Sequence, residues 1–322
     1  MAASLERTSW REVQIDHPSC WELAVASGPD DPGRLTFSDR RYHRLDLKWR
    51  AIRYVPNVDL LLTRHHSRDQ KDGRKVSPLT TAPPPWKGLV QETASACIVH
   101  AMRHFSGARL LVEASLVWPG RRDIPLENAV LASVATPDAR QDARLWQAMG
   151  LSVTCPWQYD LRASSLKVGQ IQWDFLAMAG QHKVDKQAAA LRVERMAMPE
   201  HWLKGQALRD WLAGQLPPGA RVISQMCIRQ DQQVTPGPTR GTWRSPHPAE
   251  QILSASKAPL AGRIRGLQDV RLDLAWLCPP EGRAYHVQLT QRRTDERVEP
   301  LAGLQVRCCR PVPDVAASRN VG

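Results

Sequence analysis

The sequence predicts an α+β protein made of two duplicated domains, each an antiparallel sheet packed with helices. Three observations favour this class. The 322 residues are 42% hydrophobic, which is enough for one large domain or for two of about 150 residues each. Hydrophobic and polar residues alternate over several short stretches, as is typical of half-buried strands. Tryptophans recur at matching places in the two halves, and Trp accounts for 12 residues against 4 Tyr and 3 Phe.

The two halves match when residues 136 positions apart are placed side by side. Three landmark pairs then coincide: Trp10 with Trp146, Trp21 with Trp157, and Gly33 with Gly169. The apolar positions between these landmarks also agree, although few residues are identical. A repeat of this kind predicts that the chain folds as two similar modules.

The alternation of apolar and polar residues, with a period of two, predicts the first strands of each half. In the first half we expect them at 13–15, 23–25, 35–37 and 45–49, with a turn at Gly28–Gly33. In the second half Leu191 and Val193 form the counterpart of the fourth strand. Arg192 and Glu194 alternate with them, so these charged residues face the other way.

Further landmarks follow in the same order. Pro56 begins a segment of helical character, and Pro199 begins an amphipathic helix that reaches Leu212. Another helix is expected over 90–105. A Pro-rich stretch then ends at a tryptophan in each half, and a later strand ends at another. These residues are Trp86 and Trp118 in the first half, and Trp243 and Trp276 in the second. We therefore place the domains at 1–140 and 141–322.

A hairpin with the pattern PxxGRxYxV is expected at Pro279–Val287. Because of this hairpin, the tryptophan and proline landmarks and the order of elements, each half resembles the PsbP-like α/β/α sandwich. The resemblance implies an antiparallel sheet covered by helices. It also implies a role in assembly, scaffolding or binding, because members of that fold are mostly non-enzymatic.

Composition limits the function classes. The net charge of +12 permits an acidic protein, a nucleic acid or an anionic surface as partner. We expect no signal peptide and no membrane insertion, because no apolar run reaches the required length. The seven cysteines include no CxxC pair, so we expect reduced thiols in a cytoplasmic protein without a metal or other cofactor. Cys20 and Cys155, beside strand starts, are expected to be buried structural thiols.

Three groups of residues are candidates for a site. His100 and His104 would share one face of the expected helix, which makes them a weak candidate metal pair. A basic run could contact phosphate or an acidic partner, and consists of Arg64, Arg68, Lys71, Arg74 and Lys75. Most tryptophans are expected in the core, whereas Trp86 and Trp243 in Pro-rich loops are expected to contact a partner.

No nucleophile elbow, phosphate loop or zinc motif occurs in the sequence. The leading hypothesis is therefore a non-enzymatic binding or scaffold protein, a subunit or assembly factor of a larger complex with other protein subunits as partners. No small-molecule substrate is indicated. The alternative is a nucleic-acid-binding protein that uses the basic surface at 64–75. An enzyme with a site assembled between the two domains is a third hypothesis, for which the sequence indicates no residues.

Overall fold

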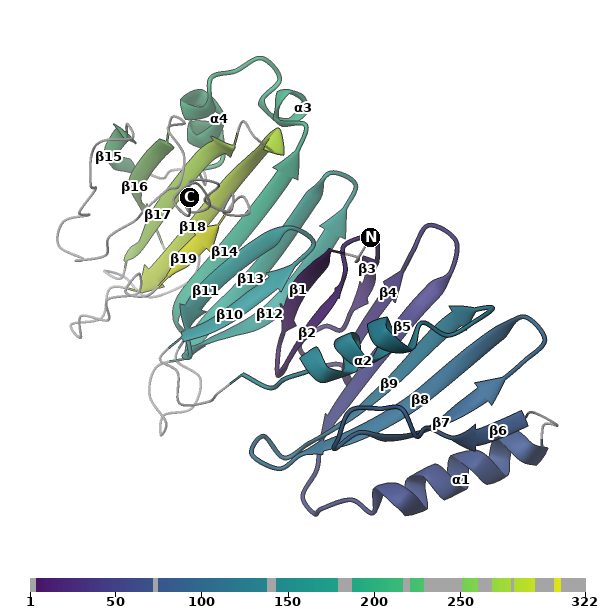
Figure 1. The fold of residues 1–322 in the computed structure, drawn as a ribbon. Helices are drawn as coiled ribbons and strands as arrows, with labels where there is room; N and C mark the ends of the chain where they lie inside the picture. The colour runs from purple at the N-terminus through teal and green to yellow at the C-terminus, as the bar shows by residue number, and fades with distance from the viewer. Residues whose placement is uncertain are drawn as a thin grey trace, which may run out of the picture. The chain divides into compact units, whose positions relative to one another are not determined.

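The computed structural model describes residues 4–71, 75–137, 143–178, 187–216, 221–228, 251–259, 268–278, 281–292 and 304–307. Its contacts divide the chain into two compact units (Figure 1). Unit 1 consists of Met1–Gln141 and Trp146–Met149, and unit 2 of Asp142–Leu145 and Gly150–Gly322. The domains expected at 1–140 and 141–322 stay a prediction.

Unit 1 is built around a seven-stranded antiparallel sheet with the order β3-β4-β5-β9-β8-β7-β6. Its strands and helices are β1 (Leu5–Trp10), β2 (Val13–Pro18), β3 (Glu22–Ala26), β4 (Gly33–Ser38), β5 (His43–Ala51), α1 (Val58–Lys71), β6 (Lys75–Pro78), β7 (Lys87–Glu92), β8 (Ala96–Phe105), β9 (Leu110–Pro119) and α2 (Ile124–Ser133). A hairpin of β1 and β2 precedes the sheet.

Unit 2 contains a second seven-stranded antiparallel sheet, with the order β12-β13-β14-β18-β17-β16-β15. Its elements are β11 (Leu151–Pro156), β12 (Tyr159–Lys167), β13 (Gln170–Met178), β14 (Gln187–Ala197), α3 (Pro199–Leu203), α4 (Leu208–Gly214), β15 (Arg221–Ile228), β16 (Gln251–Pro259), β17 (Gln268–Cys278), β18 (Arg283–Arg292) and β19 (Gln305–Arg307). β11 pairs with β19, and β10 (Ala143–Ala148) contributes residues to both units.

The two large sheets have the same strand order, so β5 corresponds to β14, β8 to β17 and β9 to β18. The expected pairing of Trp118 with Trp276 is wrong, because Trp118 lies on β9 whereas Trp276 lies on β17. In the second half Tyr285 on β18 stacks on Trp276, with ring centroids 5.2 Å apart. Duplication as the origin of the two halves stays a prediction.

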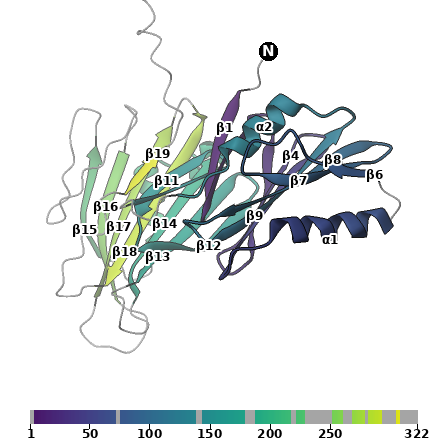
Figure 2. The same ribbon diagram turned by 60° about the horizontal axis from the view of Figure 1, so that its bottom comes forward.

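The core of unit 1 follows the alternation seen in the sequence. The inward residues of β4 and β5 are fully or almost fully buried, namely Leu35, Phe37, Leu45, Leu47 and Trp49. Helices α1 and α2 lie on opposite faces of the sheet (Figure 2). Leu62 of α1 packs on Leu89 and Met102. On the other face, Trp118 donates a hydrogen bond to Glu127 of α2 (3.1 Å).

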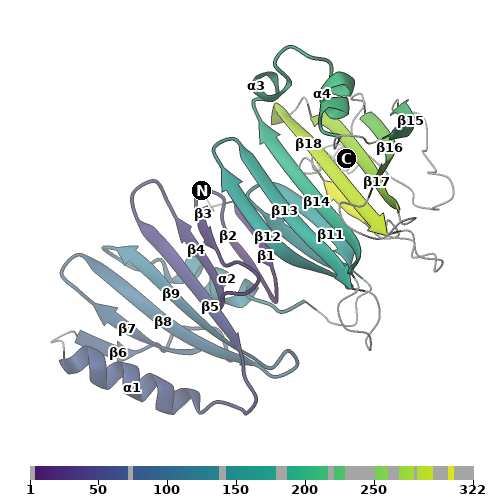
Figure 3. The ribbon, with the colours of Figure 1, turned by 180° about the vertical axis from the view of Figure 1, so that it is seen from behind.

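The core of unit 2 is formed in the same way. Trp173 and Phe175 of β13 are buried beside Leu191 and Val193 of β14, which confirms the expected fourth strand. The short helices α3 and α4 lie near the end of β14 (Figure 3). Leu212 of α4 packs there in a cluster of buried apolar residues that also includes Met196, Leu208, Trp211, Ala275 and Ala284.

The expected fold class is wrong, because the protein is mostly β. The described residues contain nineteen strands and only four helices. In unit 1 the buried face of the sheet is covered by the hairpin as well as by α2. The ring of His17 on β2 lies 4.3 Å from that of Phe37. The four helices of the described residues do not form the full helical layers of a PsbP-like sandwich, and the resemblance is wrong.

Two expected helices also differ. Residues 90–105 form parts of β7 and β8, where the β-branched pair Ile98 and Val99 favours a strand. The expected helix from Pro199 to Leu212 is broken into α3 and α4, since Lys204 and Gly205 both have a positive φ. The helical segment after Pro56 is confirmed as α1.

Candidate functional site

Trp86 lies in the core of unit 1. Its side chain is 5% exposed, and its indole N–H donates to the carbonyl oxygen of Leu131 at 2.8 Å. The expectation that Trp86 lies outside the core is wrong, because the Pro-rich loop turns its indole inward. Nine of the eleven tryptophans in the described ranges are buried, which confirms that most are core residues. Trp243 lies outside those ranges.

The basic run is only partly visible. Arg64 is exposed on α1, and Lys75 on β6 forms an ion pair with Glu92 at 2.6 Å. Arg68 and Lys71 lie on α1, but their side chains fall outside the description, as does Arg74 altogether. The role of this surface stays a prediction.

The histidine pair is not a metal site. His100 and His104 lie on the strand β8, so their four-residue separation corresponds to about 13 Å along the chain. The Nδ1 of His100 lies 3.0 Å from the hydroxyl of Ser115. Within the described ranges, no three His, Cys, Asp or Glu side chains are grouped so that they could hold a metal ion.

A hollow in unit 1 lies between the start of α1 and the end of β8. Its volume is about 240 Å3, and it is lined by Pro56, Asn57, Val58, Asp59, Pro85, Lys87, Met102, Arg103 and His104. The two residues that precede Pro56 are apolar and exposed, with Tyr54 at 85% and Val55 at 80%. We call this hollow and the loop 53–55 before it the Tyr54 surface.

The Tyr54 surface is basic. Arg103 stacks on Phe105, with its guanidinium carbon 4.1 Å from the ring centroid. The buried Nε of Arg103 has no hydrogen-bond acceptor in the described part of the chain, and burial lowers the pKa of this guanidinium. Lys87 is paired with Asp59 at 2.7 Å, and Arg53 in the loop is exposed. An acceptor from another molecule is therefore electrostatically favoured at this surface.

A second hollow of about 430 Å3 lies at the other end of β8. It is lined by residues 92–97, 120–122 and 124. Cys97 is almost fully buried there, and burial raises the pKa of its thiol. A thiol with a raised pKa is a poor nucleophile near neutral pH. Cys155 is buried as expected, whereas Cys20 is exposed, so the expected burial of Cys20 is wrong.

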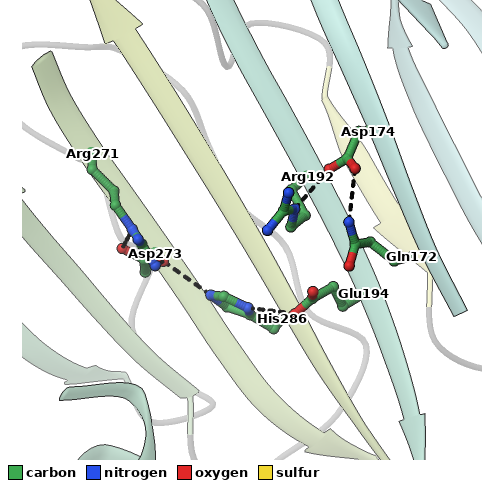
Figure 4. Close-up of polar contacts among 7 residues, drawn as sticks. All are labelled: Gln172, Asp174, Arg192, Glu194, Arg271, Asp273 and His286. Atoms are coloured by element: carbon green, nitrogen blue, oxygen red, sulfur yellow. Dashed lines mark hydrogen bonds and ion pairs between the residues drawn. The ribbon is translucent and has the colours of Figure 1, made fainter. Parts of the chain in front are cut away.

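Unit 2 contains a buried charged cluster on the polar face of its sheet (Figure 4). His286 of β18 lies between two carboxylates. Its Nε2 is 2.9 Å from Asp273 Oδ1, and its Nδ1 is 3.0 Å from Glu194 Oε2. Arg271 pairs with Asp273 at 2.7 Å. Beyond Glu194 the polar face continues with Arg192, Asp174 and Gln172, which are joined by hydrogen bonds.

The cluster favours the charged forms of His286 and Asp273. Burial by itself lowers the pKa of His286, but the hydrogen bonds and charges of Asp273 and Glu194 outweigh it and raise that pKa. Burial likewise opposes ionisation of Asp273, yet His286 and Arg271 lower its pKa. Trp211 of α4 lies edge-on to the imidazole at 5.6 Å. The cluster is therefore a neutralised network beneath α4.

This network does not suit acid–base catalysis. A general base needs a free ring nitrogen within reach of substrate, and both nitrogens of His286 are engaged by carboxylates. The sequence showed Arg192 and Glu194 on the polar face of their strand, but it did not single out His286 or Asp273. The signal that was available is the alternation of charged and apolar residues over 191–194 of β14 and 269–274 of β17.

Comparisons with known proteins name no family. No family model matches the chain, and no curated protein matches it. Three solved structures are similar at 8–9% identity. The Tle4–Tli4 complex is matched over 92% of this chain and 89% of that one (TM-score 0.34). The second is the apo form of the T6SS immunity protein TplEi from Pseudomonas aeruginosa, matched over 95% of this chain and 98% of that one (TM-score 0.36). The third is the same protein complexed with an "L" peptide, matched over 93% of this chain and 90% of that one (TM-score 0.30). These scores are too low to support an argument about function.

Among the helices of the described ranges, none combines the length and the apolar character that a membrane-spanning helix needs.

Proposed function

We propose that this chain is a non-enzymatic binding protein that recognises an acidic protein partner through the Tyr54 surface. The observation that carries the proposal is the exposure of Tyr54 and Val55 beside a basic hollow. Tyrosine is enriched among the residues that contribute most to protein interfaces. Adjacent exposed apolar side chains are a typical mark of an interaction site.

Charge complementarity indicates the chemistry of the partner. Arg103 lines the hollow, and the loop adds the exposed Arg53. The chain as a whole has a net charge of +12, which steers acidic partners toward it. The occupant we propose is a protein loop that carries a carboxylate for Arg103 and apolar side chains for Tyr54 and Val55.

We also propose that the protein is not an enzyme. His286 has both ring nitrogens engaged, and the thiol of Cys97 has a raised pKa. Neither group is therefore suited to act as a base or nucleophile near neutral pH.

Site-specific photo-crosslinking tests the proposal. A photoreactive amino acid replaces Tyr54 in one variant and Tyr42, an exposed residue of the β4–β5 turn, in the control. In cells of the source organism we expect one acidic protein to crosslink at position 54 but not at position 42. The purified partner should then bind the Tyr54→Ser/Val55→Ser variant at least about tenfold more weakly, with the unfolding midpoint unchanged.

Two results would overturn the proposal. One is an identical set of adducts at both positions, which indicates nonspecific contact. The other is affinity of the double variant for the purified partner equal to that of the wild type. Salt-sensitive binding of DNA or RNA at about 50 mM salt, without a protein adduct, would favour the nucleic-acid alternative.

A further inference from the structure

Two arginines of unit 2 converge on a glycine. Gly150 directly precedes β11, is exposed, and has a φ of +72°. A Cβ at this position would lie 2.5 Å from Arg195 Nη1 and 3.0 Å from Arg283 Nη1. The absence of a side chain at Gly150 therefore makes the room that the two guanidinium groups occupy.

The charges around this glycine do not balance. Glu281 accepts hydrogen bonds from Arg283 at 3.1 Å and from the hydroxyl of Tyr285 at 2.8 Å. The buried Nε of Arg195 has no acceptor among the residues that the structure describes. Within the described ranges the two guanidinium groups thus share one nearby carboxylate, and that carboxylate is already engaged by two donors. We call this arrangement of Gly150, Arg195, Glu281, Arg283 and Tyr285 the Arg195 notch.

The surroundings of Arg195 disfavour an unpaired charge. Burial is the main cause that lowers the pKa of its guanidinium, and repulsion from Arg283 lowers it further. The Nε of Arg195 is itself buried, so an anion would bind at the Nη groups, where its charge stabilises the guanidinium. The notch is open to such an anion, because Gly150 is exposed and the side chain of Arg283 is 32% exposed.

Unit 1 satisfies the corresponding place internally. There the turn between β1 and β2 carries Glu12, and the indole N–H of Trp49 on β5 donates to Glu12 Oε2 at 2.7 Å. In unit 2 the residue before β11 is glycine, and the donor on β14, the counterpart of β5, is Arg195. Unit 2 therefore has stronger donors at this turn but no carboxylate on it.

We propose that the Arg195 notch binds a carboxylate group supplied by another molecule. A carboxylate that approaches the two guanidinium groups from the solvent can accept from Arg195 and Arg283 at once, in the charge-assisted geometry for which guanidinium is suited. The source is either an acidic side chain of a protein or a free small carboxylic acid. The proposal does not depend on the Tyr54 surface, which lies in unit 1.

Heteronuclear NMR of the arginine Nε–Hε groups in the full chain tests this proposal. The probes are acetate, citrate and a capped glutamate-rich peptide, each compared with sodium chloride at equal ionic strength. We expect the Nε–Hε resonance of Arg195 to shift in a saturable way with a carboxylate and not with chloride. Saturation by citrate or acetate assigns the notch to free acids, and saturation by the peptide alone assigns it to an acidic chain segment.

A matched pair of variants separates the notch from general electrostatics. Arg195→Gln and Arg192→Gln each remove one positive charge from β14. Binding is followed in these two variants at the Nε–Hε resonance of Arg283, which both of them retain. We expect Arg195→Gln to weaken carboxylate binding by about tenfold or more, and Arg192→Gln to leave it unchanged. Arg283→Gln is a second notch variant if Arg195→Gln does not fold. Equal loss in the notch variant and the control, or no shift of Arg195 in the wild type, would overturn the proposal.

Discussion

His286 and Asp273 form a buried ion pair on neighbouring strands, with Nε2 of the imidazole 2.9 Å from Oδ1 of the carboxylate. Both residues are almost inaccessible, at 3% and 0% exposure. Such a pair stabilises a fold only while both partners are charged, because each charge is costly to bury alone. The stability of unit 2 should therefore depend on pH.

The sign of that dependence follows from the pKa shifts. The pKa of His286 is raised, so its stabilisation is complete below the ordinary histidine value of 6.5 and is lost as pH rises through the raised value. The pKa of Asp273 is lowered, so its stabilisation is present above the ordinary value of 3.8 and is lost as pH falls through the lowered one. We expect the unfolding midpoint of unit 2 to be highest between these limits.

Calorimetry across the neutral and alkaline range measures this effect. The His286→Gln variant should lose the decline in stability with rising pH, because the side chain no longer titrates. His43→Gln, at an exposed position of unit 1, is the control and should keep the decline. A decline that persists in His286→Gln would contradict the assignment.

Glu127 and Arg122 form a second ion pair, which lies in unit 1. It is fully buried on α2, and its carboxylate accepts from Arg122 and from the indole of Trp118. Glu127→Ala leaves both donors without this acceptor, which should destabilise unit 1 by about 3–5 kcal/mol. Chemical denaturation measures the loss. Lys75→Ala breaks only an exposed pair and should change nothing measurable, whereas equal effects of the two variants would refute the prediction.

Trp86 offers a test of burial against partner contact. Trp86→Ala removes a buried indole and should destabilise unit 1 by about 3–5 kcal/mol. Trp86→Phe keeps most of the apolar volume but loses the hydrogen bond to Leu131. We expect this loss to lower the free energy of unfolding by about 1 kcal/mol. Denaturant titrations give both values. Unchanged stability of Trp86→Ala would contradict its place in the core.

Gly33 tests how closely the indole of Trp49 packs on β4. A Cβ at Gly33 would lie 2.2 Å from the indole of Trp49, within a fully packed region. Gly33→Ala should therefore destabilise unit 1 by about 2 kcal/mol or more, measured by thermal unfolding. Gly107→Ala is the control, since nothing lies within 4 Å of its added methyl group. Equal midpoints for the two variants would argue against close packing at Gly33.

Parts of the candidate sites could be read from the sequence. The alternation at Leu191 and Val193 placed Arg192 and Glu194 on a polar face, and the structure keeps them there. The sequence could not reveal that Glu194 reaches His286, because the two residues are 92 positions apart and meet only when β14 pairs with β18. Nor could it show that Gly150 lies against Arg195.

The sequence by itself determined the local features: the strands of β4 and β5, the helix α1 and the burial of most tryptophans. These depend on the spacing of apolar residues along a short stretch of chain. The tertiary structure alone decided which strands are neighbours, and therefore that residues 90–105 extend a sheet and that Trp86 faces inward. Strand neighbours are fixed by cross-strand packing and hydrogen bonds between distant segments, which leave no period in the sequence.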